Sequence, residues 1–121
     1  MQANSINSIF IKSYEKNQIV LSNHNVLNSS FALYDNIFIN FIKLDLFNLS
    51  TYDFLNSIAQ NKEILIVGCG NKFIIPNQEI KKSILSKGLS LEWMTTKNAY
   101  HTFNLLIEDY RNVIGLFLNE N

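Results

Sequence analysis

The chain has 121 residues, 47% of them hydrophobic, and its ten basic and ten acidic residues give a formal net charge of zero. This balance excludes a disordered tail, which needs low hydrophobicity with high net charge, and it excludes nucleic-acid binding through a basic surface. One cysteine, Cys69, allows no intramolecular disulfide, and no apolar run reaches the roughly 18 residues of a membrane span.

The length fits a single domain over residues 1–121. The first residues have neither the basic and apolar regions of a secretory signal nor the Arg-rich character of a transit peptide. We therefore expect a soluble, cytoplasmic protein.

The first half of the chain predicts β structure. Residues 8–12 and 18–22 are rich in β-branched side chains and flank the polar segment 13–17, which is the pattern of a hairpin. Residues 31–34 and 36–42 predict two strands or one bent strand. Apolar groups on both faces of the second segment favour a central position in a sheet.

From residue 50 onward, helices and strands are expected to alternate. A helix is expected to begin at Ser50 or Thr51, whose hydroxyl can accept a hydrogen bond from a first-turn N–H, and to end near Gln60. The unbroken apolar run 64–67 is typical of a parallel strand buried on both faces, and it ends at Gly68-Cys69-Gly70.

The next helix is predicted to begin at Pro76, because a first helical turn does not need the missing N–H, and to end at Gly88. Its apolar stripe is formed by Ile80, Ile84 and Leu85.

A strand over 90–94 is followed by a helix that Thr95 or Thr96 is expected to cap. A last buried strand is expected over 113–118, with its orientation left open. The apolar face of this helix is formed by Ala99, Phe103, Leu106, Ile107 and Tyr110.

The pattern as a whole predicts an α/β fold of three layers. Strand–helix–strand alternation implies a mainly parallel or mixed central sheet flanked by helices, and the N-terminal hairpin adds an antiparallel β element.

The best candidate site lies at the carboxyl end of the strand over 64–67. Ligands of open α/β sheets bind at that edge, and glycines allow the backbone to approach a phosphate or carboxylate. Together with Gly68 and Gly70, the helix-start residues Thr95, Thr96 and Asn98 could form an anion site. The alternative interpretation is structural, namely a tight turn and helix capping, because no complete dinucleotide fingerprint or phosphate-binding loop is present.

Catalytic and metal-binding chemistry is weakly indicated. Cys69 and His101 could pair across the strand ends, but a small side chain in a tight turn explains Cys69 better. With His24, these residues have no metal-ligand spacing. We expect no catalytic residue, no cofactor and no metal.

Two further features could bind a partner or have a structural role. Asn104, Glu108 and Arg111 share one helical stripe, which could bind a partner, fix the connection into the last strand, or form an ordinary solvated face. Trp93 is expected to pack in the core or at its edge. The alternative is that it is exposed and forms part of an interaction site.

The strand ending at Gly68-x-Gly70 and the segment from Thr96 to Leu106 resemble the Mth-type domain family. Its pattern is an aliphatic strand ending in G-T-G, then D-T-x-x-A-x-x-T-[YF]-N-x-L and an E-G-R turn. The chain departs from this pattern at Cys69, Thr95, Asp109 and Tyr110. The matching residues are Gly68, Gly70, Thr96, Ala99, Thr102, Phe103, Asn104, Leu106 and Arg111.

The resemblance implies a three-layer α/β fold with an added β element. The family includes mitochondrial complex I assembly factor 3 and the adipogenesis-associated Mth domain protein, and it thereby implies a non-enzymatic role in assembling respiratory complex I. Related eukaryotic proteins work in the mitochondrial matrix or at the inner membrane. Because it lacks a transit peptide, this chain resembles a bacterial member or an already processed protein. Peripheral attachment to the membrane is an alternative to a purely cytoplasmic location.

Two functions remain from the sequence. In the first, the domain is a non-catalytic assembly factor whose partners are proteins, such as complex I subunits or other assembly factors at the membrane. In the second, it is a ligand-binding domain or enzyme that holds a small anion or nucleotide-like ligand at Gly68-Cys69-Gly70. The oligomeric state is left open.

Overall fold

A computed structural model of the protein describes residues 8–15 and 18–120. At its centre is a five-stranded sheet with the spatial order β5-β4-β8-β6-β7. Its strands, in chain order, are β4 (Ser30–Tyr34), β5 (Ile37–Phe41), β6 (Ile64–Gly68), β7 (Ser90–Met94) and β8 (Val113–Phe117).

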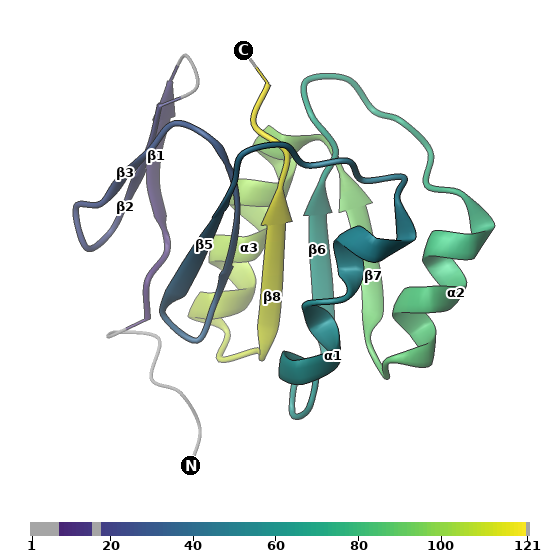
Figure 1. Ribbon diagram of the computed structural model, residues 1–121. Coiled ribbons are helices and arrows are strands. Elements are labelled where there is room, and N and C mark those ends of the chain that lie inside the picture. Colours follow the sequence, from purple (N-terminus) through teal and green to yellow (C-terminus); the bar gives the residue numbers. More distant parts are fainter. Residues whose placement is uncertain (1–7, 16–17, 121) are drawn as a thin grey trace.

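Helices cover both faces of this sheet. Helix α3 (Thr96–Glu108) lies on one face, and the 3₁₀-helix η2 (Leu49–Tyr52), α1 (Leu55–Ile58) and α2 (Gln78–Ser86) lie on the other (Figure 1). On the α3 side, an antiparallel sheet is formed by β1 (Ile11–Glu15), β2 (Gln18–Leu21) and β3 (Val26–Leu27). The predicted three-layer α/β fold with an added antiparallel element is confirmed.

The order of the strands explains why the helices lie on opposite faces. The chain moves from β6 outward to β7 through α2, and then returns past β6 to β8 through α3. Because crossovers between parallel strands have one hand, reversing the direction places the second helix on the other face. The last strand, β8, is parallel to β6 and antiparallel to β4, so it joins the two halves of the sheet.

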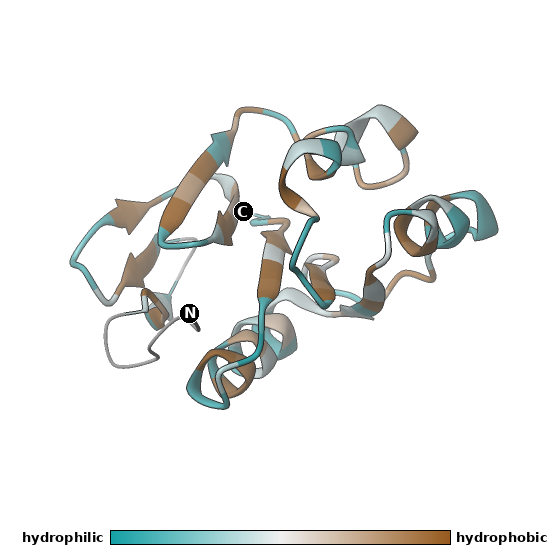
Figure 2. Cartoon of the chain, turned by 90° about the horizontal axis from the view of Figure 1, so that it is seen from below, coloured by the Kyte–Doolittle hydropathy of each residue, from teal (hydrophilic) through white to brown (hydrophobic). Residues whose placement is uncertain are grey.

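Two apolar clusters fill the layers. Every residue of β6 and β8 is buried, and alternate side chains of β6 enter opposite clusters: Ile64 and Ile66 on the α3 side, and Leu65 and Val67 on the α2 side. Figure 2 shows the same division, with hydrophobic residues on the strands and with helices that are apolar on one side and polar on the other. The predicted buried strands 64–67 and 113–118 are confirmed, and so is the strand over 90–94.

The N-terminal hairpin is confirmed with shifted bounds. Strand β1 runs to Glu15, through most of the segment expected to turn, and pairs with β2 through a register that places Glu15 opposite Gln18. The rest of the predicted turn, residues 16–17, lies outside the described residues. A third strand, β3, pairs with β2; no strand was predicted for this segment.

The segment 30–41 forms two strands rather than one bent strand. Asp35 and Asn36 both adopt left-handed backbone conformations, with φ of 49° and 63°, and this two-residue turn pairs β4 with β5. The expected central position of β5 is wrong, because β5 is an edge strand and Ile37 is 51% exposed. Apolar residues on both faces do not report whether a strand has one neighbour or two.

The helix expected from Ser50 to Gln60 is also wrong in detail. The chain forms η2, a bend, and the one-turn helix α1. Asn48, not a hydroxyl residue, caps η2 by accepting a hydrogen bond from the backbone N–H of Ser50. Tyr52 anchors this segment, since its buried hydroxyl donates to the carbonyl oxygen of Leu46 at 2.6 Å.

Two side chains assigned to buried helical stripes are exposed. Helix α2 begins after its N-cap Asn77, and Leu85 on that helix points to solvent, while Ile80 and Ile84 are buried as predicted. Tyr110 lies beyond the end of α3 and has a positive φ of 61°, so it does not belong to the apolar face of that helix. Gly88 has the predicted left-handed conformation after α2, with φ of 82°.

Candidate functional site

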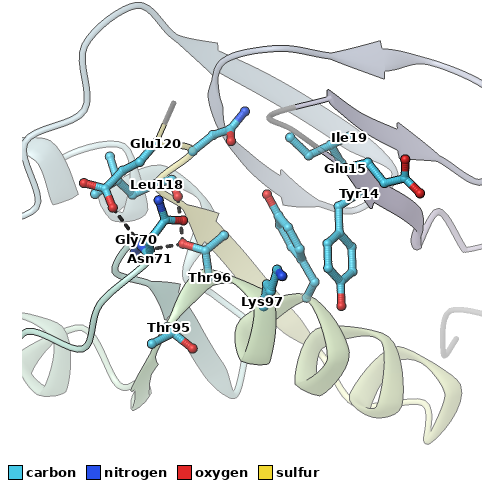
Figure 3. Close-up of a pocket in the computed structure, with 12 residues that line it drawn as sticks. Tyr14, Glu15, Ile19, Gly70, Asn71, Thr95, Thr96, Lys97, Leu118 and Glu120 are labelled. Atoms are coloured by element: carbon cyan, nitrogen blue, oxygen red, sulfur yellow. Dashed lines mark hydrogen bonds between the residues drawn. The ribbon is translucent and has the colours of Figure 1, made fainter.

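Three segments meet at the carboxyl end of the central sheet: the loop after β6, the start of α3 and the tail after β8 (Figure 3). The hydroxyl of Thr96 joins all three. Its oxygen accepts a hydrogen bond from the backbone N–H of Gly70 at 2.8 Å and donates to the carbonyl oxygen of Leu118 at 2.7 Å. Thr96 therefore does not cap α3; its side chain ties the edge of the sheet together.

Gly68 allows α3 to pack closely on β6. A Cβ atom at this position would lie 2.8 Å from the Cα of Thr96 and 3.1 Å from the Cβ of Ala99. Both are atoms that cannot move without shifting the helix. Glycine is required here by the approach of the helix start, which is a structural role.

Gly70 has a different role, because it leaves room for a carboxylate. Its φ is 107°, and the carboxylate of Glu120 occupies the space that a side chain at Gly70 would need. One oxygen of that carboxylate accepts a hydrogen bond from the backbone N–H of Asn71 at 2.7 Å. The loop after β6 thus receives a carboxylate, and the chain itself supplies it.

Cys69 is buried between the sheet and the layer of α1 and α2. Its thiol donates a hydrogen bond to the carbonyl oxygen of Lys72 at 3.5 Å. His101 is exposed on α3, which covers the opposite face of the sheet. The structure does not bring the two residues together, so the Cys–His pair weighed from the sequence is not formed.

The start of α3 has free hydrogen-bond donors. Thr95 is the N-cap residue by its backbone conformation, but its hydroxyl makes no capping hydrogen bond. Because the Thr95 hydroxyl does not cap the helix, the backbone N–H groups of Lys97 and Asn98 have no acceptor among the described residues. The side chain of Asn98 is exposed, and Thr102 is half-buried one turn further along the helix.

Asn104 and Arg111, the other two predicted site residues, lie outside this edge. The carboxamide of Asn104 exchanges two hydrogen bonds with the backbone of Ile11 in β1. Arg111 forms an ion pair with Glu63, with 3.0 Å between Nη2 and Oε1, just before β6. Arg111 ties the connection into β8 to Glu63, which agrees with the second of the three interpretations given to the stripe. Asn104 instead ties α3 to β1, a role that none of the three described.

The carboxylate of Glu63, just before β6, is bound by two neighbouring residues. The backbone N–H of Asn112 and the guanidinium of Arg111 both bind its carboxylate and hold the pKa of that group below its usual value. Asp109 and Glu108 have no part in this contact.

A groove of about 740 Å³ opens beside the Gly70 loop, between the β1–β2 hairpin and α3. Figure 3 shows Tyr14, Glu15 and Ile19 of the hairpin on one side of it, and Thr96, Leu118 and Glu120 on the other. The rings of Tyr14 and Tyr100 pack with their centroids 4.9 Å apart. The hairpin residues were not predicted as part of the site, because nothing in the local sequence places β1 beside α3. The adjacency of Tyr100 to the T-x-x-A motif was the one available signal.

A second feature is an exposed apolar surface at the edge strand β7. Phe73, Ile74 and Ile75 in the loop after β6 are exposed, and Leu85 of α2 is 61% exposed. The indole N–H of Trp93 donates to the carbonyl oxygen of Ile74, which holds this loop against β7. We call Phe73, Ile74, Ile75, Leu85 and Trp93 the β7 patch.

The β7 patch includes a shallow groove of about 390 Å³, in which Lys81 is the charged lining residue. Strand β7 ends the five-stranded sheet, so its outer side has no strand partner in the part of the chain that the structure describes. Within residues 8–15 and 18–120, no group of three or more His, Cys, Asp or Glu side chains is placed to hold a metal ion.

These features define an α/β domain with a three-stranded accessory sheet. Residues 11–118 match the family described as protein of unknown function (DUF498/DUF598), and the chain belongs to that family. A solved member of the same fold is described as an Mth938-like domain, which supports the resemblance to the Mth-type family.

Solved structures from three bacteria share the fold. A Bartonella henselae protein described as an outer membrane protein has a TM-score of 0.82 at 18% identity, over 93% of this chain and 95% of that one. A Bordetella parapertussis protein has a TM-score of 0.80 at 19% identity, over 93% and 97%. The Mth938-like domain from Bordetella pertussis has a TM-score of 0.78 at 18% identity, over 98% and 89%.

A relative in sequence is the 13 kDa major membrane protein of Francisella tularensis subsp. holarctica. It is 39% identical over 56 residues, and the match spans 46% of each chain, less than half the length of that relative. No helix within residues 8–15 and 18–120 of the present chain is long and apolar enough to cross a membrane.

Proposed function

We propose that the protein is a non-catalytic interaction factor that binds a partner protein through the β7 patch. The observation that carries this proposal is the exposure of large apolar side chains in a contiguous group, with Ile75 71% exposed and Phe73 58% exposed. Exposed patches of this kind mark interaction sites in proteins that are otherwise well packed.

The open edge of β7 supports the same proposal. An extended segment of a partner can add to a free sheet edge through main-chain hydrogen bonds, while pockets beside the edge accept its alternate side chains. The groove beside Trp93 is such a pocket, lined by apolar side chains and by Lys81. The partner segment is therefore expected to be extended and apolar, with an acidic residue placed to meet Lys81.

The partner we propose is a subunit or assembly intermediate of a membrane-bound respiratory complex, NADH:quinone oxidoreductase. The resemblance to the Mth-type family supports this choice. A relative in sequence described as a major membrane protein, and a protein of the same fold described as an outer membrane protein, support work at a membrane. Docking through an apolar patch would give membrane association without a membrane-spanning helix.

The test compares strains that lack the protein or carry single variants of it. We expect deletion to reduce the amount of assembled NADH:quinone oxidoreductase on blue-native gels, and the wild-type chain to restore it. Ile75→Lys should fail to restore assembly, because a buried lysine at the patch would carry an unpaired charge. Ile42→Lys is the matched control, since Ile42 is a fully exposed isoleucine outside the patch.

Two outcomes would contradict the proposal separately. Normal assembly of the complex in the deletion strain would rule out the respiratory partner. Full restoration by Ile75→Lys would rule out the β7 patch. Self-association of the purified chain that Ile75→Lys abolishes, measured by sedimentation, would assign the patch to a second copy of this chain instead.

A further inference from the structure

The groove between the β1–β2 hairpin and α3 has the size and lining of a small-molecule site. Its volume of about 740 Å³ falls in the range of roughly 300–1,000 Å³ that is typical of ligand pockets. Its apolar lining comes from the rings of Tyr14 and Tyr100 and from Ile19 and Leu118. These residues belong to elements on both sides of the groove, so the site exists only in the folded chain.

Tyr100 presents an unused hydroxyl to this groove. The residue is only 3% exposed, and its ring packs against Phe31, Phe117 and Tyr14. Its hydroxyl has no hydrogen-bond partner among the described residues. Every side-chain nitrogen or oxygen atom that is fully buried among these residues does have a partner. The hydroxyl therefore keeps contact with solvent, and the groove is the cavity that Tyr100 lines.

This hydroxyl is available as a donor. Burial, with a smaller contribution from Tyr14, raises the pKa of Tyr100 above its usual value, so the group remains protonated at physiological pH. A protonated phenol with no internal acceptor is expected to donate to whatever occupies the groove.

The start of α3 supplies further donors at the same place. The backbone N–H of Lys97 has no acceptor among the described residues, and Lys97 is one of the residues that line the groove. The N-terminus of a helix carries a partial positive charge, which favours an anion. Donors and positive charge thus lie along the α3 side of an apolar groove.

Carboxylates of the chain limit how much negative charge a ligand can carry. Glu120 already occupies the other polar end, on the N–H of Asn71, and Glu15 lies on the hairpin side of the groove. A second charge on the ligand would face one of these groups. The site is consistent with one carboxylate and disfavours a phosphate ester or a dicarboxylate.

We infer that this groove binds a small monocarboxylic acid with a hydrocarbon body. Its carboxylate accepts hydrogen bonds from the Tyr100 hydroxyl and from Lys97, and its body lies against Ile19, Leu118 and the ring of Tyr14. This site is separate from the β7 patch, so either assignment can fail without the other.

The first experiment titrates octanoate into ¹⁵N-labelled protein and follows the amide signals by NMR. We expect saturable shifts at Lys97, Asn98 and the β1–β2 hairpin. Octanol, which has the same chain without the charge, should bind at least tenfold more weakly, because charge-assisted hydrogen bonds are lost. Inorganic phosphate alone should produce no saturable shift. Equal binding of octanol, or saturable binding of phosphate at the same amides, would overturn the assignment.

The second experiment removes the donors one at a time. Tyr100→Phe and Lys97→Gln should each weaken octanoate binding by about tenfold. Tyr34→Phe and Lys82→Gln are matched controls outside the groove and should bind like the wild-type chain. If Tyr100→Phe does not fold, Lys97→Gln decides, because that side chain is exposed. Wild-type affinity in Lys97→Gln, or shifts confined to the β7 patch, would overturn the proposal.

Discussion

The carboxamide of Asn104 and the backbone of Ile11 exchange two hydrogen bonds between residues 93 positions apart in the sequence. The Asn104 Nδ2 donates to the Ile11 carbonyl oxygen at 2.8 Å, and the Ile11 N–H donates to Asn104 Oδ1 at 2.9 Å. The carboxamide thereby satisfies both backbone groups of Ile11 on the outer side of β1, as a neighbouring strand would. This contact holds the three-stranded sheet on α3 and so shapes one wall of the groove.

Asn104→Ala is expected to destabilise the protein by about 1–3 kcal/mol, because both backbone groups of Ile11 lose their partner in a half-buried place. The free energy of unfolding in urea measures this effect. Asn98→Ala, an exposed asparagine on the same helix, should change it by less than about 0.5 kcal/mol. Equal stability of the two variants would show that the hydrogen bonds between Asn104 and Ile11 contribute nothing to the free energy of unfolding.

Thr96→Val is expected to cost about 2–3 kcal/mol, because it keeps the shape of the side chain but leaves the Gly70 N–H and the Leu118 carbonyl unpaired. Thermal or chemical unfolding checks this value. Thr95→Val is the neighbouring control, since the Thr95 hydroxyl makes no capping hydrogen bond. A larger loss from Thr95→Val than from Thr96→Val would contradict the assigned roles.

Gly68→Ala should destabilise the protein by about 1–3 kcal/mol, because the added methyl group meets the helix backbone at Thr96. Gly88→Ala provides a contrast at a position with no heavy atom near the added group but a positive φ. That variant should cost about 1 kcal/mol through backbone conformation alone. Hydrogen exchange should report faster opening of the first turn of α3 in Gly68→Ala only.

Glu63 predicts a defined dependence of stability on pH. Its pKa is lower in the folded chain than in the unfolded one, so its contribution is present above the unfolded pKa of about 4.3 and is lost as pH falls through the folded value. Glu63→Gln should therefore lower the melting temperature more at pH 7 than in acid, where the carboxyl becomes protonated in the folded chain as well. Glu92→Gln, at an exposed glutamate on β7, is the matched control. A Glu63→Gln effect that is constant with pH would contradict this account.

Local sequence predicted the elements whose signals are local. The runs over 64–67 and 113–118 predicted buried strands because both of their faces are apolar, and both strands form. Gly88 predicted the end of α2 because few other residues adopt its left-handed conformation. Tyr110 has a positive φ at the position where the family pattern has glycine. The residues around this turn, and not a glycine, therefore determine its backbone conformation.

Elements that depend on distant neighbours were predicted less well. Apolar residues on both faces of β5 suggested a central strand, although only its position beyond β4 decides that it has one neighbour. Ser50 and Thr51 had the chemistry of caps, but Asn48 provides the cap because the chain enters η2 two residues earlier. The motif residues Thr96 and Asn104 were found, whereas their contacts with Leu118 and Ile11 could not be read from spacing.

The sequence by itself determined the class of fold, the buried strands, the loop at Gly68-Cys69-Gly70 and the absence of a charge excess that would bind nucleic acid. These follow from periodicity, glycine conformation and composition, which act over a few residues or over the whole chain. Only the tertiary structure decided that Glu120 occupies the Gly70 loop, that Tyr100 packs on Tyr14 of the hairpin and lines a groove with it, and that Phe73 and Leu85 form one apolar surface. Such contacts join residues far apart in the chain, and their geometry is set by how the layers pack.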